Sequence, residues 1–162
     1  MESGNETALL QEIHRGAEMG SASIALLLPK VRNAAFRSDL KTQLDSYTAL
    51  ADQAEQALAR TGTCPKPLSG AEQFWLEAGV WCRTALNRET AHLAKLMIQG
   101  SNMGILTLTG ILNSYGSPRD NPAQSQTEAQ FAAPPENAAA ALARQMIRTE
   151  SDNIDRLKVY LV

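Results

Sequence analysis

Apolar and small residues recur at alternating steps of three and four positions along most of the chain, a spacing that predicts amphipathic α-helices. The pattern is clearest over residues 89–115, where it runs through Leu93, Leu96, Gly100, Met103, Thr107 and Ile111. The same kind of pattern predicts four more helices, over residues 7–28, 35–60, 70–86 and 136–160. No segment reads as a convincing strand, so the sequence predicts an all-α fold in a single domain over residues 1–162.

Glycine and proline mark where these helices end. Pro29 ends or kinks the first helix because proline cannot donate a backbone hydrogen bond, and Gly62 suits a C-terminal stop. Residues 63–70 form a loop in which Ser69 is a candidate N-cap for the short helix. Residues 116–135 hold four of the seven prolines, which predicts a long loop without secondary structure of its own.

A glycine motif occurs twice, as Gly16-Ala-Glu-Met-Gly20 in the first helix and as Gly100-Ser-Asn-Met-Gly104 in the helix over residues 89–115. Each glycine inside a helix costs about 1 kcal/mol relative to alanine. Close approach of another backbone would offset that cost, so we predict that all four glycines are helix-packing positions. We interpret the two copies as a duplicated helical hairpin.

Two hairpins joined by a long connection form a four-helix bundle. The connection from Gly62 to Asn87 is long enough to travel the length of the bundle, so the helices on either side of it can run parallel. Its short helix contains Trp75 and Trp81. We favour a lid over the core for these tryptophans rather than a partner-binding patch, because exposed aromatic patches are the rarer case.

Composition excludes several classes of protein. Apolar residues make up 44% of the chain, enough for a core, and the net charge of −2 with no basic block argues against nucleic acid or an anionic membrane. No apolar run approaches the roughly 20 residues of a membrane span, and the N-terminus lacks a signal pattern. Two cysteines, Cys64 and Cys82, are too few for a disulfide framework, so we expect a cytoplasmic protein with reduced thiols.

Four segments, one from each long predicted helix, carry a family resemblance. They read GAEMGSASIALLLPKV, SDLKTQLDSYTALADQAEQAL, TAHLAKLMIQGSNMGI and RTESDNIDRLKVYL. Through them the chain resembles an uncharacterised family of bacterial four-helix proteins in the ferritin-like superfamily. The resemblance implies a ferritin-like bundle of two pseudo-repeated hairpins, with iron-storage proteins and di-iron oxidases as distant relatives. It implies no particular activity.

The di-iron form of that fold needs a glutamate on each of two helices and Glu-x-x-His on each of the other two. At the first pair of positions the chain has Glu18 and Asn102. At the second pair it has Thr48-Ala-Leu-Ala51, and Glu150 followed by Asn153. Two carboxylates cannot complete a set of six ligands, so we predict no di-iron site.

One Glu-x-x-His does occur, at Glu89 and His92 in the first turn of a predicted helix. We read Glu89 as a partner of the helix dipole and His92 as an ordinary hydrogen-bonded side chain, and the alternative is a surface metal pair completed by a neighbouring chain. Asn153 lies in an apolar stripe and must be hydrogen-bonded if buried. Its candidate partners are Tyr47, Gln99 and Asn102.

The missing ligands favour a non-enzymatic ferritin-like structural or interaction protein that holds no cofactor. Small-residue stripes and the crossover helix would suit a homo-oligomer, and the sequence indicates no other protein partner. The alternative is a metal-binding or oxidative-stress-related ferritin-like protein that holds iron or manganese through an atypical set drawn from Glu18, Glu89, His92 and Glu150. A third hypothesis is a carrier with a small ligand in a gap beside the glycines.

Overall fold

The structure, a computed structural model, describes residues 2–85, 87, 89–116 and 137–162. Across these ranges it contains five α-helices, two short 3-10 helices and no strand, which confirms the predicted all-α class. The α-helices are α1 (Glu2–Leu27), α2 (Ala34–Arg60), α3 (Gly70–Ala85), α4 (Thr90–Gly116) and α5 (Ala138–Leu157). The 3-10 helices η1 (Leu28–Lys30) and η2 (Lys158–Tyr160) continue α1 and α5.

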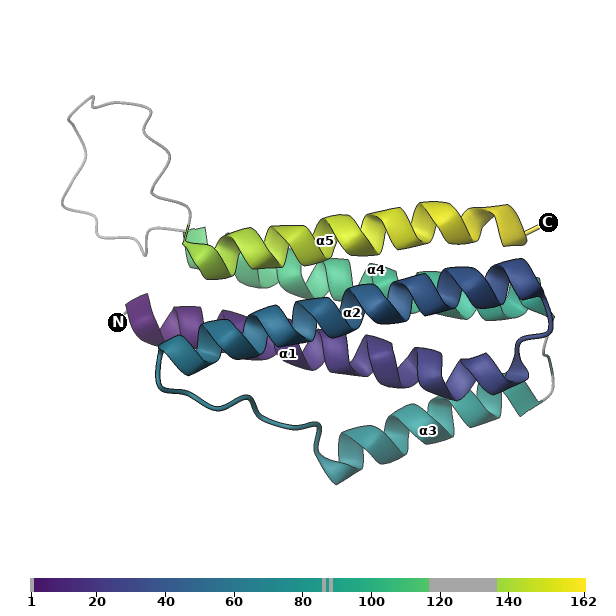
Figure 1. The fold of residues 1–162 in the computed structure, drawn as a ribbon, viewed down its shortest axis with the longest axis horizontal. Coiled ribbons are helices and arrows are strands. Elements are labelled where there is room, and N and C mark those ends of the chain that lie inside the picture. The colour runs from purple at the N-terminus through teal and green to yellow at the C-terminus, as the bar shows by residue number, and fades with distance from the viewer. Residues whose placement is uncertain (1, 86, 88, 117–136) are drawn as a thin grey trace.

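Four long helices lie side by side, and the shorter α3 flanks them (Figure 1). α1 packs on α2 and α4 packs on α5, each as an antiparallel pair. α5 also packs against α1 and α2, while α4 and α3 each contact α1. Because α3 returns along the length of the bundle, α2 and α4 point in the same direction, as the long connection predicts.

Local sequence explains where the helices begin and end. Ser69 and Glu72 form a capping box at the start of α3, in which the Ser69 hydroxyl accepts from the Glu72 amide at 3.2 Å and the Glu72 carboxylate accepts from the Ser69 amide at 2.8 Å. Asn33 and Asn137 cap α2 and α5 through their side-chain oxygens. Gly62 follows α2 with a φ of 71°, the left-handed conformation expected at a glycine stop.

The helix boundaries agree closely with the sequence predictions except at two ends. α1 begins at Glu2 rather than at residue 7, and α5 ends at Leu157 before the turn η2 rather than at residue 160. The predicted loop over residues 116–135 lies almost wholly outside the described residues. So do the side chains of Trp75 and Trp81, for which a lid was predicted, although α3 itself packs along α1.

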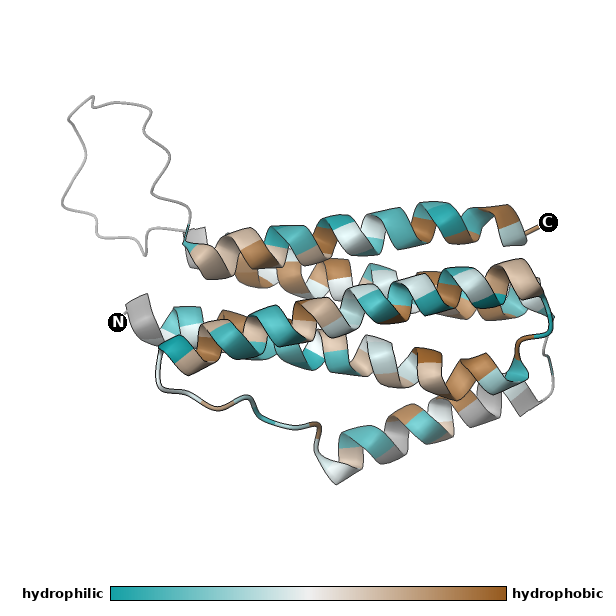
Figure 2. Ribbon diagram, viewed as in Figure 1, coloured by the Kyte–Doolittle hydropathy of each residue, from teal (hydrophilic) through white to brown (hydrophobic). Residues whose placement is uncertain are grey.

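The core lies where the inward faces of the four long helices meet, and its largest fully buried residues include Leu9, Ile13, Ile24, Phe36, Leu40, Leu58, Leu93, Met146 and Leu157. Hydrophilic residues spread along the visible side of α2, while the C-terminal part of α1 is hydrophobic (Figure 2). This distribution is that of amphipathic helices packed around one core. Among the helices of the described residues, none has the length and apolar character to cross a membrane.

The predicted stripe of α4 is right at its two ends, Leu93 and Ile111, and wrong between them. The buried residues of α4 are Leu93, Ala94, Met97, Ser101 and Leu108. Met103 from the predicted stripe is instead 70% exposed, and its neighbour Leu106 is 72% exposed. Each residue turns a helix by about 100°, so this difference rotates the buried face by roughly one position. The error arises because apolar and small residues surround much of α4, so periodicity alone allows more than one face.

Candidate functional site

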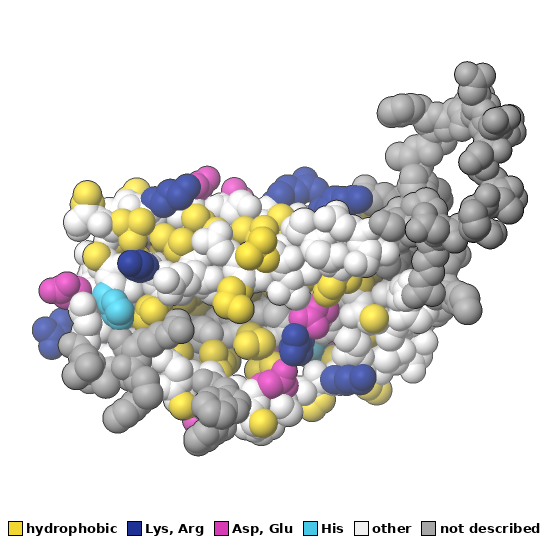
Figure 3. Space-filling model, turned by 180° about the vertical axis from the view of Figure 1, so that it is seen from behind, with side chains coloured by type: hydrophobic (Ala, Val, Ile, Leu, Met, Phe, Trp, Pro, Cys, Tyr) yellow, Lys and Arg dark blue, Asp and Glu magenta, His cyan; other side chains and the backbone are white. Residues whose placement is uncertain are grey.

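A pocket of about 430 Å³ opens between α1, α3 and α4. Its walls are mainly apolar and include Met19, Leu76, Val80, Leu96, Met97 and Leu108. Its inner end reaches α2 at Tyr47 and α5 at Met146 and Glu150. Figure 3, which shows the molecule from behind, has hydrophobic side chains gathered along the middle of this face with a few charged side chains beside them.

Most of the stripe predicted for α4 lies on the wall of this pocket. Leu96, Gly100, Met103 and Thr107 all line it, so the residues predicted to face the core face the pocket instead. Glycines from three helices also line it, namely Gly16 and Gly20 of α1, Gly79 of α3, and Gly100 and Gly104 of α4. Since glycine has no side chain, these positions add no side-chain atoms to the walls of the pocket.

The two glycines of α1 make room for side chains from other helices. A Cβ added at Gly20 would lie 2.7–2.9 Å from ring carbons of Tyr47, closer than real Cβ contacts allow. A Cβ at Gly16 would meet the terminal methyl of Met146 at 3.0 Å. The groups that approach these two glycines are a thioether and an aromatic ring, whereas the motif predicts a helix backbone.

The two glycines of α4 differ from each other. A Cβ at Gly104 would lie 3.4 Å from Oε1 of Glu150, an ordinary close contact. A Cβ at Gly100 would meet nothing within 4 Å, so Gly100 does not act as the helix-packing position that the motif predicts. Because α4 presents its Gly100 face to the pocket and its Ser101 face to the core, Gly100 borders open space.

A buried polar cluster lies at the inner end of the pocket. The Tyr47 hydroxyl donates a hydrogen bond of 2.7 Å to Oε2 of Glu150, whose residue is only 4% exposed. The Ser101 side chain also lines the pocket and is 3% exposed, yet its Oγ has no hydrogen-bond partner. Glu150 therefore has hydrogen-bonding capacity beyond the Tyr47 bond, and the Ser101 hydroxyl lies buried beside it.

Burial dominates the electrostatics of this cluster. It raises the pKa of the Glu150 carboxyl, and the neighbouring Ser101 and Tyr47 hydroxyls offset part of that rise. The Ser101 hydroxyl lies close enough to lower the pKa of Glu150, although it forms no hydrogen bond with the carboxyl. Burial, followed by the charge of Glu150 and its hydrogen bond, raises the pKa of Tyr47 far above its usual range. Tyr47 is therefore the donor and Glu150 the acceptor.

Asn153 lies one turn beyond Glu150 on α5 and is buried, as its place in the apolar stripe predicts. Its amide nitrogen has no hydrogen-bond partner. Of the three candidate partners, Gln99 and Asn102 are exposed, whereas the Tyr47 hydroxyl donates to Glu150 and can still accept a hydrogen bond. The Asn153 side chain lowers the pKa of Tyr47, so it lies beside the Tyr47 hydroxyl, and the register-setting hydrogen bond stays a prediction.

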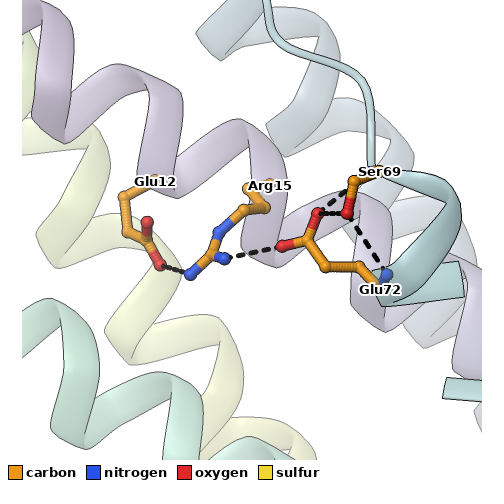
Figure 4. A network of polar contacts seen from close by, with 4 residues as sticks. All are labelled: Glu12, Arg15, Ser69 and Glu72. Carbon is orange, nitrogen blue, oxygen red and sulfur yellow. Dashed lines mark hydrogen bonds and ion pairs between the residues drawn. The ribbon is translucent and has the colours of Figure 1, made fainter. Parts of the chain in front are cut away.

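An ion-pair network links α1 to the start of α3 beside the mouth of the pocket (Figure 4). Arg15 contacts Glu12 at 2.7 Å and Glu72 at 2.8 Å. Hydrogen bonds from the amide and the hydroxyl of Ser69, and then from Arg15, lower the pKa of Glu72. The hydrogen bonds to Glu12 and Glu72 raise the pKa of Arg15, so this cation is already matched by two carboxylates.

The four candidate metal ligands lie in different settings. Glu150 is buried at the inner end of the pocket, whereas Glu18 is half-buried on α1. Glu89 directly precedes α4, where its carbonyl accepts from the Leu93 amide at 3.0 Å, and His92 is half-buried in the first turn. In the described part of the chain, no three histidine, cysteine or acidic side chains lie together as a metal-binding group would require.

The sequence contains a signal for the Tyr47–Glu150 pair that periodicity obscured. Between Met146 and Asn153 the helical spacing allows either Thr149 or Glu150 to face inward, because Glu150 lies four residues after Met146 and three before Asn153. In the structure Glu150 is the buried one. The signal in the sequence is thus a glutamate on one apolar stripe together with a tyrosine on the apolar stripe of another helix.

Comparisons of the chain with protein-family models, with curated proteins and with solved structures return no match. The pocket and its residues are therefore the basis for proposing a function. Of the two cysteines, Cys64 is an exposed free thiol, and the side chain of Cys82 lies outside the described residues.

Proposed function

We propose that this protein is a non-enzymatic ferritin-like helical bundle that binds a small, largely apolar organic molecule in the pocket between α1, α3 and α4. The observation that carries the proposal is the pocket itself, whose volume of about 430 Å³ falls within the usual range for small-molecule sites. An apolar wall with a few convergent polar groups and a perturbed carboxyl is the typical composition of such a site.

The ferritin-like part of the proposal is supported by connectivity. Two antiparallel helix pairs are joined by a crossover that lets α2 and α4 run parallel, which is the arrangement that the family resemblance implies. In this proposal the inner end of the pocket, with Glu150, Tyr47 and Ser101, replaces the metal centre of distant ferritin-like relatives. The alternative with iron or manganese remains a prediction, and Glu150 is the one of its four candidate ligands that lines the pocket.

Self-association is the second candidate, and one observation favours it. Met103 and Leu106 of α4 are 70% and 72% exposed, although both are large apolar side chains. They occupy neighbouring positions on one side of α4, close to the mouth of the pocket that Met103 also lines. A second copy of the chain could cover them, and sedimentation of wild-type protein beside a Leu106→Glu variant would measure that association.

The experiment for the ligand-binding proposal fills the pocket without disturbing the core. Gly100→Leu places a side chain where no atom lies within 4 Å, and Gly110→Leu makes the same change on the same helix at an exposed glycine away from the pocket. Both substitutions favour the helix. We expect the neutral dye Nile red to bind wild-type protein and the Gly110→Leu control equally, and Gly100→Leu about tenfold more weakly.

Two outcomes of that titration would count against the proposal. If Nile red fails to bind wild-type protein, the pocket does not accept an apolar molecule. If Gly100→Leu and Gly110→Leu bind the dye equally well, the dye occupies some other surface. Circular dichroism of both variants checks that they keep the helical content of the wild type.

A further inference from the structure

Among the described residues, Glu150 has no cationic partner. Its single hydrogen bond comes from the neutral hydroxyl of Tyr47, and within the described part of the chain no lysine, arginine or histidine forms an ion pair with it. Buried carboxylates are normally paired or coordinate metals, because an isolated charge is costly to bury. The pairing group for Glu150 is therefore not supplied by the described residues of the chain.

The pocket makes this acid accessible to a ligand. Glu150 and Ser101 both line it, and Oε1 of Glu150 lies against the bare backbone of Gly104, where any larger residue would add atoms between the acid and α4. Ser101 Oγ has no hydrogen-bond partner although the residue is 3% exposed. A ligand that reaches the inner end of the pocket thus meets the Glu150 carboxyl, with the buried Ser101 hydroxyl beside it.

The guanidinium of Arg15, at the mouth of the pocket, does not pair with Glu150. Arg15 is the one cationic side chain among the described residues that line the pocket, and it is paired with Glu12 and Glu72. Pairing with two carboxylates holds its guanidinium at the α1–α3 junction (Figure 4). Among the described residues of the pocket lining, no cation is therefore left to pair with Glu150.

We propose that the ligand of this pocket is a hydrophobic amine, whose protonated amino group pairs with Glu150 while its apolar body lies between α1, α3 and α4. This inference rests on the proposed ligand-binding function and names its chemical class. A primary ammonium has three N–H donors and no acceptor, which suits the carboxylate of Glu150 at the end of an apolar pocket. An organic acid would instead place a second negative charge beside Glu150.

The test compares three probes of equal chain length, n-octylamine, 1-octanol and octanoate, in displacing Nile red at neutral pH. We expect n-octylamine to bind wild-type protein at least about tenfold more tightly than 1-octanol, because a charge-assisted hydrogen bond replaces a neutral one. Octanoate should bind most weakly. Equal or tighter binding of 1-octanol or octanoate would overturn the inference, as would a failure of all three to displace a dye that does bind.

A substitution at the acid gives a second measurement. Glu150→Gln keeps an acceptor for Tyr47 but removes the charge, and Glu55→Gln makes the same change at an exposed position of α2 outside the pocket. We expect Glu150→Gln to bind n-octylamine about tenfold more weakly and 1-octanol within about threefold of wild type, with Glu55→Gln unchanged for both. An unchanged affinity of Glu150→Gln for n-octylamine would contradict the pairing.

These measurements separate the inference from the function on which it rests. If Nile red does not bind, the ligand-binding function fails and the inference fails with it. If Nile red binds at the pocket and 1-octanol matches n-octylamine, only the amine inference fails. The probe ranking uses wild-type protein, so it remains decisive even if Glu150→Gln does not fold.

Discussion

The hydroxyl of Tyr47 on α2 donates a hydrogen bond of 2.7 Å to Oε2 of Glu150 on α5. The two residues lie 103 positions apart in the chain and belong to different antiparallel helix pairs. The bond is buried, and it lies at the inner end of the pocket that we propose as the ligand site. One contact therefore joins the two halves of the bundle and shapes the polar end of the site.

Removing the donor of this bond should destabilise the fold. Tyr47→Phe leaves the buried Glu150 carboxyl without its hydrogen bond, and we expect a loss of about 1–3 kcal/mol in the free energy of unfolding. Urea unfolding followed by circular dichroism measures it. In a double-mutant cycle with Glu150→Ala, which removes the acceptor, the two changes should not add, and strict additivity would mean that the pair does not interact in solution.

The pKa of Glu150 predicts how stability changes with pH. Because burial raises the folded-state pKa above the unfolded value, the folded protein holds its proton at pH values where the unfolded chain has lost it. Unfolding therefore becomes more favourable as pH rises through that window. Glu150→Gln abolishes this contribution, so the variant should gain stability relative to wild type as pH rises above the unfolded-state pKa of glutamate, about 4.3, and a difference that stays constant with pH would refute the assignment.

Glycine substitutions along α1 and α4 should rank by the space around each position. Gly20→Ala forces a Cβ within 2.9 Å of the Tyr47 ring and should cost about 1–3 kcal/mol of stability. Gly16→Ala meets only the flexible end of Met146, and should be milder than Gly20→Ala. Gly110→Ala meets nothing within 4 Å and should stabilise by about 0.5–1 kcal/mol through helix propensity.

Thermal or urea unfolding of the three glycine variants gives their order directly. The expected order of stability is Gly110→Ala, then Gly16→Ala, then Gly20→Ala. If Gly20→Ala proves as stable as Gly110→Ala, the close packing of Tyr47 against α1 is not present in solution.

The start of α3 should open locally when its cap is removed. Ser69→Ala deletes the hydroxyl that accepts from the Glu72 amide and donates to the Glu72 carboxylate, and an N-cap contributes about 1 kcal/mol. We expect amide hydrogen exchange in α3 to quicken about fivefold, with exchange in α2 and α5 unchanged. Equal acceleration in all helices would show that α3 unfolds only with the whole bundle.

Much of the architecture could be predicted because its determinants are local. Pro29, Gly62 and the Ser69–Glu72 box act within a turn of where they stand in the sequence, so the ends of α1, α2 and α3 follow from them. The all-α class follows from helical spacing over long segments. The start of α1 at Glu2 was missed because the first residues show little apolar periodicity.

The candidate site was harder to predict, because it depends on how helices are rotated about their own axes. Periodicity allowed Thr149 or Glu150 to face inward on α5, and Met97 or Gly100 on α4. The glycine motif predicts contacts between helix backbones, whereas Gly16 and Gly20 accommodate side chains and Gly100 borders the pocket. The sequence allowed the hypothesis of a gap beside the glycines, but it did not predict the Tyr47–Glu150 pair at the inner end of that gap.

The sequence by itself determined the helices, their approximate ends and the long crossover, since spacing, capping residues and chain length act on each segment independently of the others. Only the tertiary structure decided that Tyr47 meets Glu150 and that Gly100 faces the pocket. Those outcomes depend on a rotation of about 100° per residue about each helix axis. The packing of all the helices together sets that rotation, and no single segment encodes it.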